Sequence, residues 1–153
     1  MPTPEEVRDV NMANLAAAHA VYVEAVREAF GSEGLEVIRE ANRLRGLDIG
    51  MEAIRNGELR EHDLESIFHF FERATPFFGF GLELVSVDDR HLELKVTRCP
   101  WLDTFQTMAQ EDICEWVCAM DEGIGQAVDP ELRLTLPRCM MRGDPWCIYR
   151  WEK

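Results

Sequence analysis

The sequence predicts an α+β fold, with an N-terminal helical layer packed on a four-stranded antiparallel sheet and one helix inserted between its two hairpins. Apolar residues recur at helical spacing up to about residue 75, and after Pro76 they alternate with polar residues, as in strands. A second helical stretch, about 110–128, separates two pairs of alternating segments. We expect a single domain over residues 1–153, divided into a helical part (1–75) and a part with the sheet, inserted helix and cysteines (76–153).

The first helix begins with a capping signal. Thr3 can accept a hydrogen bond from the backbone three residues on, Glu6 can complete a capping box, and Pro4 suits the first helical position. The apolar spacing then continues to about Phe30. Gly31 is therefore expected to end this helix.

Three more helices are expected before residue 75. The second follows Ser32, and Gly46 is expected to interrupt it. The third runs from about residue 48 to residue 55, and Asp63 caps the fourth. The fourth helix is rich in phenylalanine, which is expected to pack the core or to wall an apolar pocket.

Four alternating segments are expected to form the sheet. They cover residues 80–87, 91–98, 131–138 and 146–151. Turn residues at 88–90 join the first two, and Gly143-Asp144-Pro145 precedes the last. Leucine and valine occupy one side of the first hairpin and charged residues the other, so this hairpin should have one polar face.

Composition and charge narrow the class of function. The formal net charge of −13 argues against nucleic acid, because an acidic surface is repelled by a phosphate backbone, and it disfavours anionic membranes. No apolar run approaches the length of a membrane span, and no signal peptide is evident. We therefore expect a cytoplasmic protein whose partner is a small molecule, and a homodimer is compatible with the sequence.

All five cysteines lie after residue 98. In the cytosol such a cluster is more often metal-binding or catalytic than disulfide-bonded. We predict that Cys99, Cys118, Cys139 and Cys147 converge on a metal ion, with Zn²⁺ the expected occupant. Cys114 is left out of this set, although it could replace Cys118 because both share a helix face. The alternative is that the cysteines are small buried hydrophobic residues.

Two charged residues complete the candidate site. Asp121 lies on the same face of the inserted helix as Cys114 and Cys118, beside the apolar stripe, where a pocket could form. Arg98 falls on the apolar side of the alternation in the second strand. A buried guanidinium needs an anionic partner, so we predict that Arg98 faces the interior and recognises a carboxylate, either that of Asp121 or that of a ligand.

Several motifs resemble known families. Arg98-Cys99-Pro100, Cys118-Ala119-Met120-Asp121 and Gly143-Asp144-Pro145-Trp146-Cys147 resemble the 2-aminothiazoline-4-carboxylate hydrolase family, over roughly residues 79–151. The spacing Cys139-x3-Gly143-Asp144-x2-Cys147 also resembles the end motif of the 4-vinyl reductase domain, a small-molecule-binding module. Both resemblances imply a compact α+β domain with an internal ligand pocket near the cysteines, and the second implies cysteine-bound zinc in some members.

The resemblances imply different functions. The first implies a hydrolase that opens the ring of a small heterocyclic carboxylate, with Cys118 as nucleophile or metal ligand, Asp121 positioning or deprotonating water, and Arg98 holding the substrate carboxylate. The second implies a non-catalytic sensor or carrier of an apolar ligand. A third alternative is a structural zinc site that joins the sheet to the inserted helix. A polar catalytic pocket would favour the hydrolase, and a deep apolar one would favour the binding domain.

Overall fold

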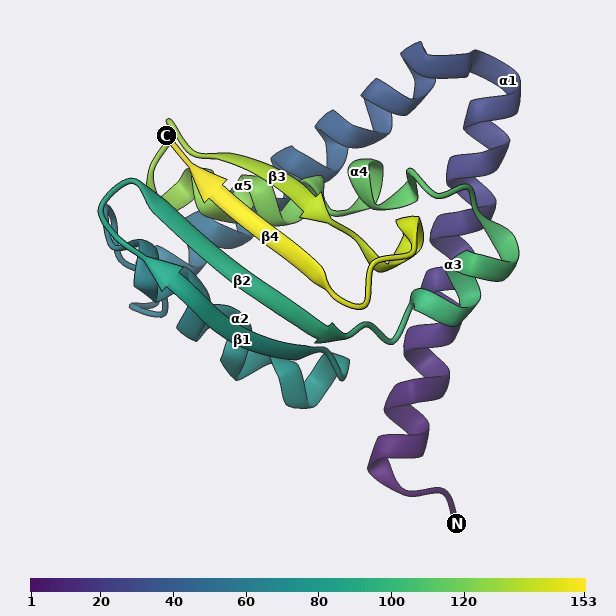
Figure 1. Cartoon of the computed structure of the whole chain (residues 1–153), viewed down its shortest axis with the longest axis horizontal. Coiled ribbons are helices and arrows are strands. Elements are labelled where there is room, and N and C mark those ends of the chain that lie inside the picture. Colours follow the sequence, from purple (N-terminus) through teal and green to yellow (C-terminus); the bar gives the residue numbers. More distant parts are fainter.

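The computed structural model describes all 153 residues and confirms the α+β fold (Figure 1). The strands are β1 (Gly81–Val87), β2 (His91–Arg98), β3 (Arg133–Arg138) and β4 (Cys147–Glu152). Their order in the sheet is β1-β2-β4-β3, and all neighbouring pairs are antiparallel. In Figure 1 the helices α2 (Leu64–Phe78) and α5 (Ala119–Val128) and the later part of α1 (Pro4–Arg55) lie behind the sheet. The strand limits agree with the predicted ones to within two residues, because the alternation that defines them is local.

Helix α1 spans Pro4–Arg55 and changes direction at Gly31 (Figure 1). The Thr3 side chain accepts from the backbone of Glu6, and the Glu6 side chain accepts from the backbone of Thr3, which confirms the capping box. Gly31 has a φ of 63°, a conformation that suits glycine, and it separates two helical arms as predicted. The first arm extends beyond the sheet, and the second lies behind the sheet, where it packs against α5.

The predicted interruption at Gly46 is wrong, and so is the separate third helix. The second arm of α1 continues through Gly46 and ends at Asn56. A Cβ at Gly46 would clash with the backbone of Met120 in α5 (Ala119–Val128), and Gly123 of α5 approaches α1 in the same way. Gly46 therefore allows a close crossing of two helices. Met120, which Gly46 meets, lies far away in the sequence. The residues next to Gly46 therefore do not reveal the crossing, and the glycine looks like the end of a helix.

The predicted inserted helix is broken. It consists of α4 (Ile113–Val117) and α5, which meet at Cys118, and α3 (Leu102–Met108) precedes them. Cys118 has a ψ of 0°, so the helical ladder does not run continuously through it. Asp121, beyond the break, lines the pocket described below, and Cys114, before the break, does not.

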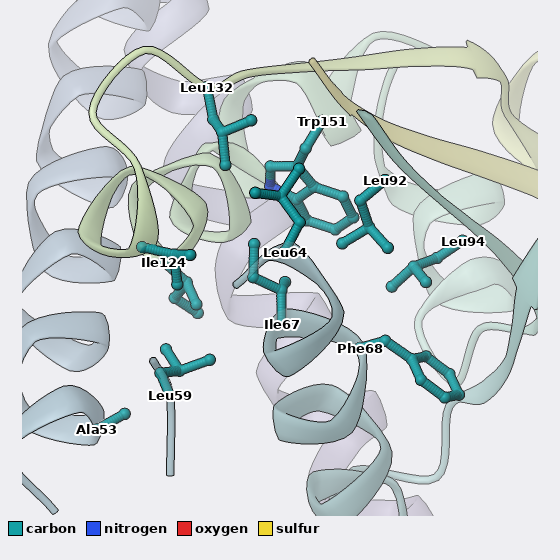
Figure 2. Close-up of a cluster of buried hydrophobic side chains, with 11 residues drawn as sticks. Ala53, Leu59, Leu64, Ile67, Phe68, Leu92, Leu94, Ile124, Leu132 and Trp151 are labelled. Carbon is teal, nitrogen blue, oxygen red and sulfur yellow. The ribbon is translucent and has the colours of Figure 1, made fainter. Parts of the chain in front are cut away.

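The main core lies between the sheet and the helices. Helix α2 (Leu64–Phe78) begins at Asp63, whose side chain accepts from the backbone of Ser66 as the predicted cap requires. Figure 2 shows the cluster of eleven buried side chains that joins α2 to the sheet and to α5. It comprises Ala53, Leu59, Leu64, Ile67, Phe68, Leu92, Leu94, Ile124, Val128, Leu132 and Trp151. No helix has both the length and the apolar character needed to cross a membrane.

Candidate functional site

A cavity of about 520 Å³ lies between the sheet and the helices, next to the main core. Hydrophobic residues make up 17 of its 20 lining residues, and the remaining three are His19, Thr75 and Asp121. No lysine or arginine lines it. Seven of the lining residues are aromatic: Phe70, Phe71, Phe78, Phe80, Trp101, Tyr149 and Trp151.

The aromatic wall follows from the patterns of α2 and the sheet. Helix α2 buries Phe68 in the core and turns Phe71 towards the cavity, where it meets Trp151 at a ring separation of 5.8 Å. Tyr149 and Trp151 share the helix-facing side of β4 because they are two residues apart, and their rings are 6.0 Å apart. Trp101 closes another side, with its ring 5.6 Å from that of Phe80. These contacts fix the shape of an apolar pocket.

Asp121 is the only acidic residue that lines the pocket. It lies in the first turn of α5, where its backbone carbonyl accepts a hydrogen bond from Trp151 Nε1 at 3.0 Å. Its carboxylate forms no hydrogen bond or ion pair with the protein. Burial raises the pKa of the Asp121 carboxyl to about 7, because no nearby cation compensates its charge. The side chain keeps some accessible surface because it faces the cavity.

Cys118 lies beside Asp121 on the pocket wall. Its Sγ is 3.0 Å from the hydroxyl of Tyr149, and its residue is only 8% exposed. Burial and the neighbouring Cys118 and Asp121 raise the pKa of Tyr149 well above its usual value. The pocket thus combines a thiol, a phenol and a carboxyl group in otherwise apolar surroundings.

The other thiols form a second group next to the pocket. Cys139 and Cys147 are buried together, and Cys99 and Cys114 pack against them. All five cysteines are free thiols.

The thiols of this group shift one another's pKa values. Hydrogen bonds from Cys114 and Cys147 lower the pKa of Cys139. Hydrogen bonding to Cys118 and Cys139 raises the pKa of Cys114, and hydrogen bonding to Cys139 raises that of Cys147. Burial raises the pKa of Cys99 to about 12.

The geometry does not support the predicted zinc set. No group of three or more histidine, cysteine, aspartate or glutamate side chains is placed to hold a metal ion. Cys118 pairs with Tyr149 at the pocket, whereas Cys139 and Cys147 belong to the second group. The thiol that meets Cys139 from the inserted region is that of Cys114, which was left out of the set. Zinc bound by Cys99, Cys118, Cys139 and Cys147 therefore stays a prediction.

The prediction that Arg98 faces the interior is wrong. Its side chain is 52% exposed, and it forms an ion pair with Asp9 of α1 at 3.2 Å. It also donates to the carbonyl of Gly79, at the end of α2, at 2.6 Å. Arg98 lies at the end of β2, beyond the buried part of the strand, where the first arm of α1 supplies the carboxylate instead of Asp121. Arg98 therefore ties α1 to the α2–β1 junction and does not line the pocket.

His19, Trp101 and Tyr149 also line the pocket, although the sequence did not mark them as pocket residues. His19 packs against Trp101 at a ring separation of 5.3 Å, and burial lowers the pKa of its imidazole. Tyr149 could have been found from its alternation with Trp151 in the last strand. His19 had no such signal, because its place on the pocket wall depends on how α1 packs against distant residues.

The family of the chain is shown by its sequence. The model of the L-2-amino-thiazoline-4-carboxylic acid hydrolase family matches residues 10–151. The chain belongs to this family. The match confirms the resemblance carried by the motifs around Arg98, Cys118 and Cys147. A comparison with curated proteins gives no match.

Two solved structures share the fold. The phenol-responsive sensory domain of the transcription activator PoxR, crystallised with phenol, is 17% identical, with a TM-score of 0.66; the alignment covers 90% of this chain and 73% of that one. Subunit 3 of a trafficking protein particle complex from Naegleria fowleri, covalently bound to palmitic acid, is 18% identical, with a TM-score of 0.62, and 94% and 95% of the two chains are covered. At these identities the likeness shows the fold alone.

Proposed function

We propose that the protein binds a small, largely apolar organic molecule in the pocket between the sheet and the helices, as a sensor or carrier domain does. The observation that carries this proposal is the pocket lining, of which 17 of 20 residues are hydrophobic and none is lysine or arginine. Its volume of about 520 Å³ lies within the range typical of small-molecule sites. Two proteins of the same fold hold phenol and palmitic acid, and both molecules have a large apolar part.

The affinity expected for a one-ring molecule can be bounded from the surface area that the ring buries in the pocket. A single aromatic ring buries roughly 150 Å² of surface, which is worth about 4 kcal/mol at 25 cal/mol per Å². Because association itself costs free energy, about 1 mM is the tightest dissociation constant expected from the ring alone. A one-ring molecule should therefore bind weakly, and the native ligand should gain affinity from filling more of the pocket and from its polar contacts.

The proposal is tested by filling the pocket. Ala74 of α2 lines the cavity, so Ala74→Phe should occupy it and abolish the rise in thermal midpoint that benzyl alcohol produces in the wild type. Ala41→Phe is the matched control, because Ala41 is exposed on α1. An equal rise in all three proteins would show that benzyl alcohol binds elsewhere, and the proposal would fail.

A second candidate function is hydrolysis, which the family name and one feature of the pocket favour. Cys118 and Asp121 both line the cavity, and a carboxyl whose pKa lies near 7 suits proton transfer at neutral pH. In this reaction the Cys118 thiolate would add to the amidine carbon of an aminothiazoline, and the ring C–S bond would break as the departing ring sulfur takes a proton from Asp121. Water would then displace Cys118 from that carbon as a free thiol and leave a urea. Against this candidate, the pocket offers no lysine or arginine to the substrate carboxylate, since Arg98 lies outside.

The test of hydrolysis is turnover of 2-aminothiazoline-4-carboxylate by purified protein. If the reaction uses these groups, the wild type turns over and both Cys118→Ser and Asp121→Asn lose most of the activity, because each removes one chemical role. Absence of turnover in a wild type that still binds benzyl alcohol would leave the binding function alone. Turnover that survives both substitutions would remove Cys118 and Asp121 from the mechanism.

A further inference from the structure

From the charge of the pocket we infer that its ligand is an organic cation, an amine or amidine on an apolar body without a carboxylate, and that Asp121 is its anionic partner. The inference rests on the proposed binding function and deepens it. It begins with a carboxylate that is partly buried, lines the cavity and has no partner in the chain. Buried charges in proteins are normally paired, so the missing partner is expected to come with the ligand.

The side chains around Asp121 do not supply a positive charge. Tyr149 and Cys118, from β4 and the start of α5, are neutral or negative groups, and Thr75 of α2 is uncharged. His19 of α1 is the only basic group in the lining, and burial disfavours its charged form. A cationic nitrogen in the pocket would therefore be the first positive charge that Asp121 meets.

The aromatic wall favours the same sign of charge. The face of an aromatic ring carries negative potential and attracts a cation, most strongly when the ring belongs to tryptophan. Trp101, Trp151 and Tyr149 all line the cavity, together with four phenylalanines. Both the rings and Asp121 repel a carboxylate, and the net charge of −13 draws cations towards the protein. The pocket is thus selective by charge as well as by apolar surface.

The test uses three ring compounds of similar size that differ in charge: benzylamine, benzyl alcohol and benzoate. They are titrated calorimetrically into the full chain at about pH 8, above the pKa of Asp121. Benzylamine is expected to bind about tenfold more tightly than benzyl alcohol, the usual gain from a hydrogen bond to a charged group, and benzoate should bind most weakly. Equal or tighter binding of benzyl alcohol or benzoate would overturn the inference.

Two variants assign the effect to Asp121. Asp121→Asn should remove the preference for benzylamine, so that benzylamine and benzyl alcohol bind with similar affinities, and a cooperative thermal transition shows that the variant has folded. Asp103→Asn makes the same charge change at an exposed position of α3 and should keep the preference. A preference that survives Asp121→Asn would overturn the role of Asp121. If none of the three compounds binds to the wild type, the binding function itself fails, a result distinct from binding without charge preference.

Discussion

The unpartnered carboxyl of Asp121 makes the stability of the ligand-free protein depend on pH. Its pKa rises from 3.8 to about 7 on folding, so the folded state holds a proton that the unfolded chain releases between these values. Stability is therefore lost as pH rises from about 4 through 7, and the full penalty is present above 7. At 1.36 kcal/mol per pKa unit the penalty is about 4 kcal/mol, and water entering the pocket would reduce it.

Asp121→Asn removes this titration while nearly keeping the shape of the side chain. The free energy of unfolding of the variant minus that of the wild type should be larger at pH 8 than at pH 4, by up to about 4 kcal/mol. The reason is that only the wild type carries the buried charge at pH 8. Urea denaturation at the two pH values measures the difference, with Asp103→Asn as the control for a lost surface charge. A stability difference between Asp121→Asn and wild type that is the same at both pH values would refute this reasoning.

Three further predictions follow from the packing and the cysteines. Gly46→Ala should destabilise the protein by about 2 kcal/mol or more in urea denaturation, because the new methyl group meets the backbone of Met120; a neutral effect would contradict the close crossing. Arg98→Ala should cost about 1 kcal/mol or less, since its ion pair with Asp9 is exposed, and it should leave benzyl alcohol binding unchanged; loss of binding in calorimetry would return Arg98 to the site. The zinc prediction expects about one zinc per chain by elemental analysis and a lower thermal midpoint after chelation, and metal-free protein with an unchanged midpoint would contradict it.

The sequence predicted those parts of the fold that depend on local signals. The capping box of Thr3 and Glu6, the break at Gly31 and the Asp63 cap each involve residues within a few positions of one another. The strands were found because a period of two shows within a single hairpin. Gly46 was misinterpreted because the reason for that glycine is a helix crossing with α5, which only the tertiary structure reveals.

The candidate site was predicted only in part, because local spacing places some of its residues and tertiary packing places the others. Cys118 and Asp121 were expected beside a pocket, because their spacing placed them at the edge of an apolar stripe, and both line the cavity. The break at Cys118 could not be seen in a pattern that was helical on both sides, so the different roles of Cys114 and Cys118 were missed. The alternation in β2 placed Arg98 on the apolar side of the strand. It could not show that the buried core ends before Arg98, so the side chain is exposed.

The central claim is that a small apolar molecule occupies the cavity between the sheet and the helices. A crystal structure of the wild-type protein with benzyl alcohol tests it most directly. We expect the ring to lie among Phe71, Trp101 and Tyr149, with its hydroxyl group towards Asp121, because these residues line the cavity and the carboxylate of Asp121 has no partner in the chain. A cavity filled by rearranged side chains, or a ligand bound only on the outer surface, would contradict the claim.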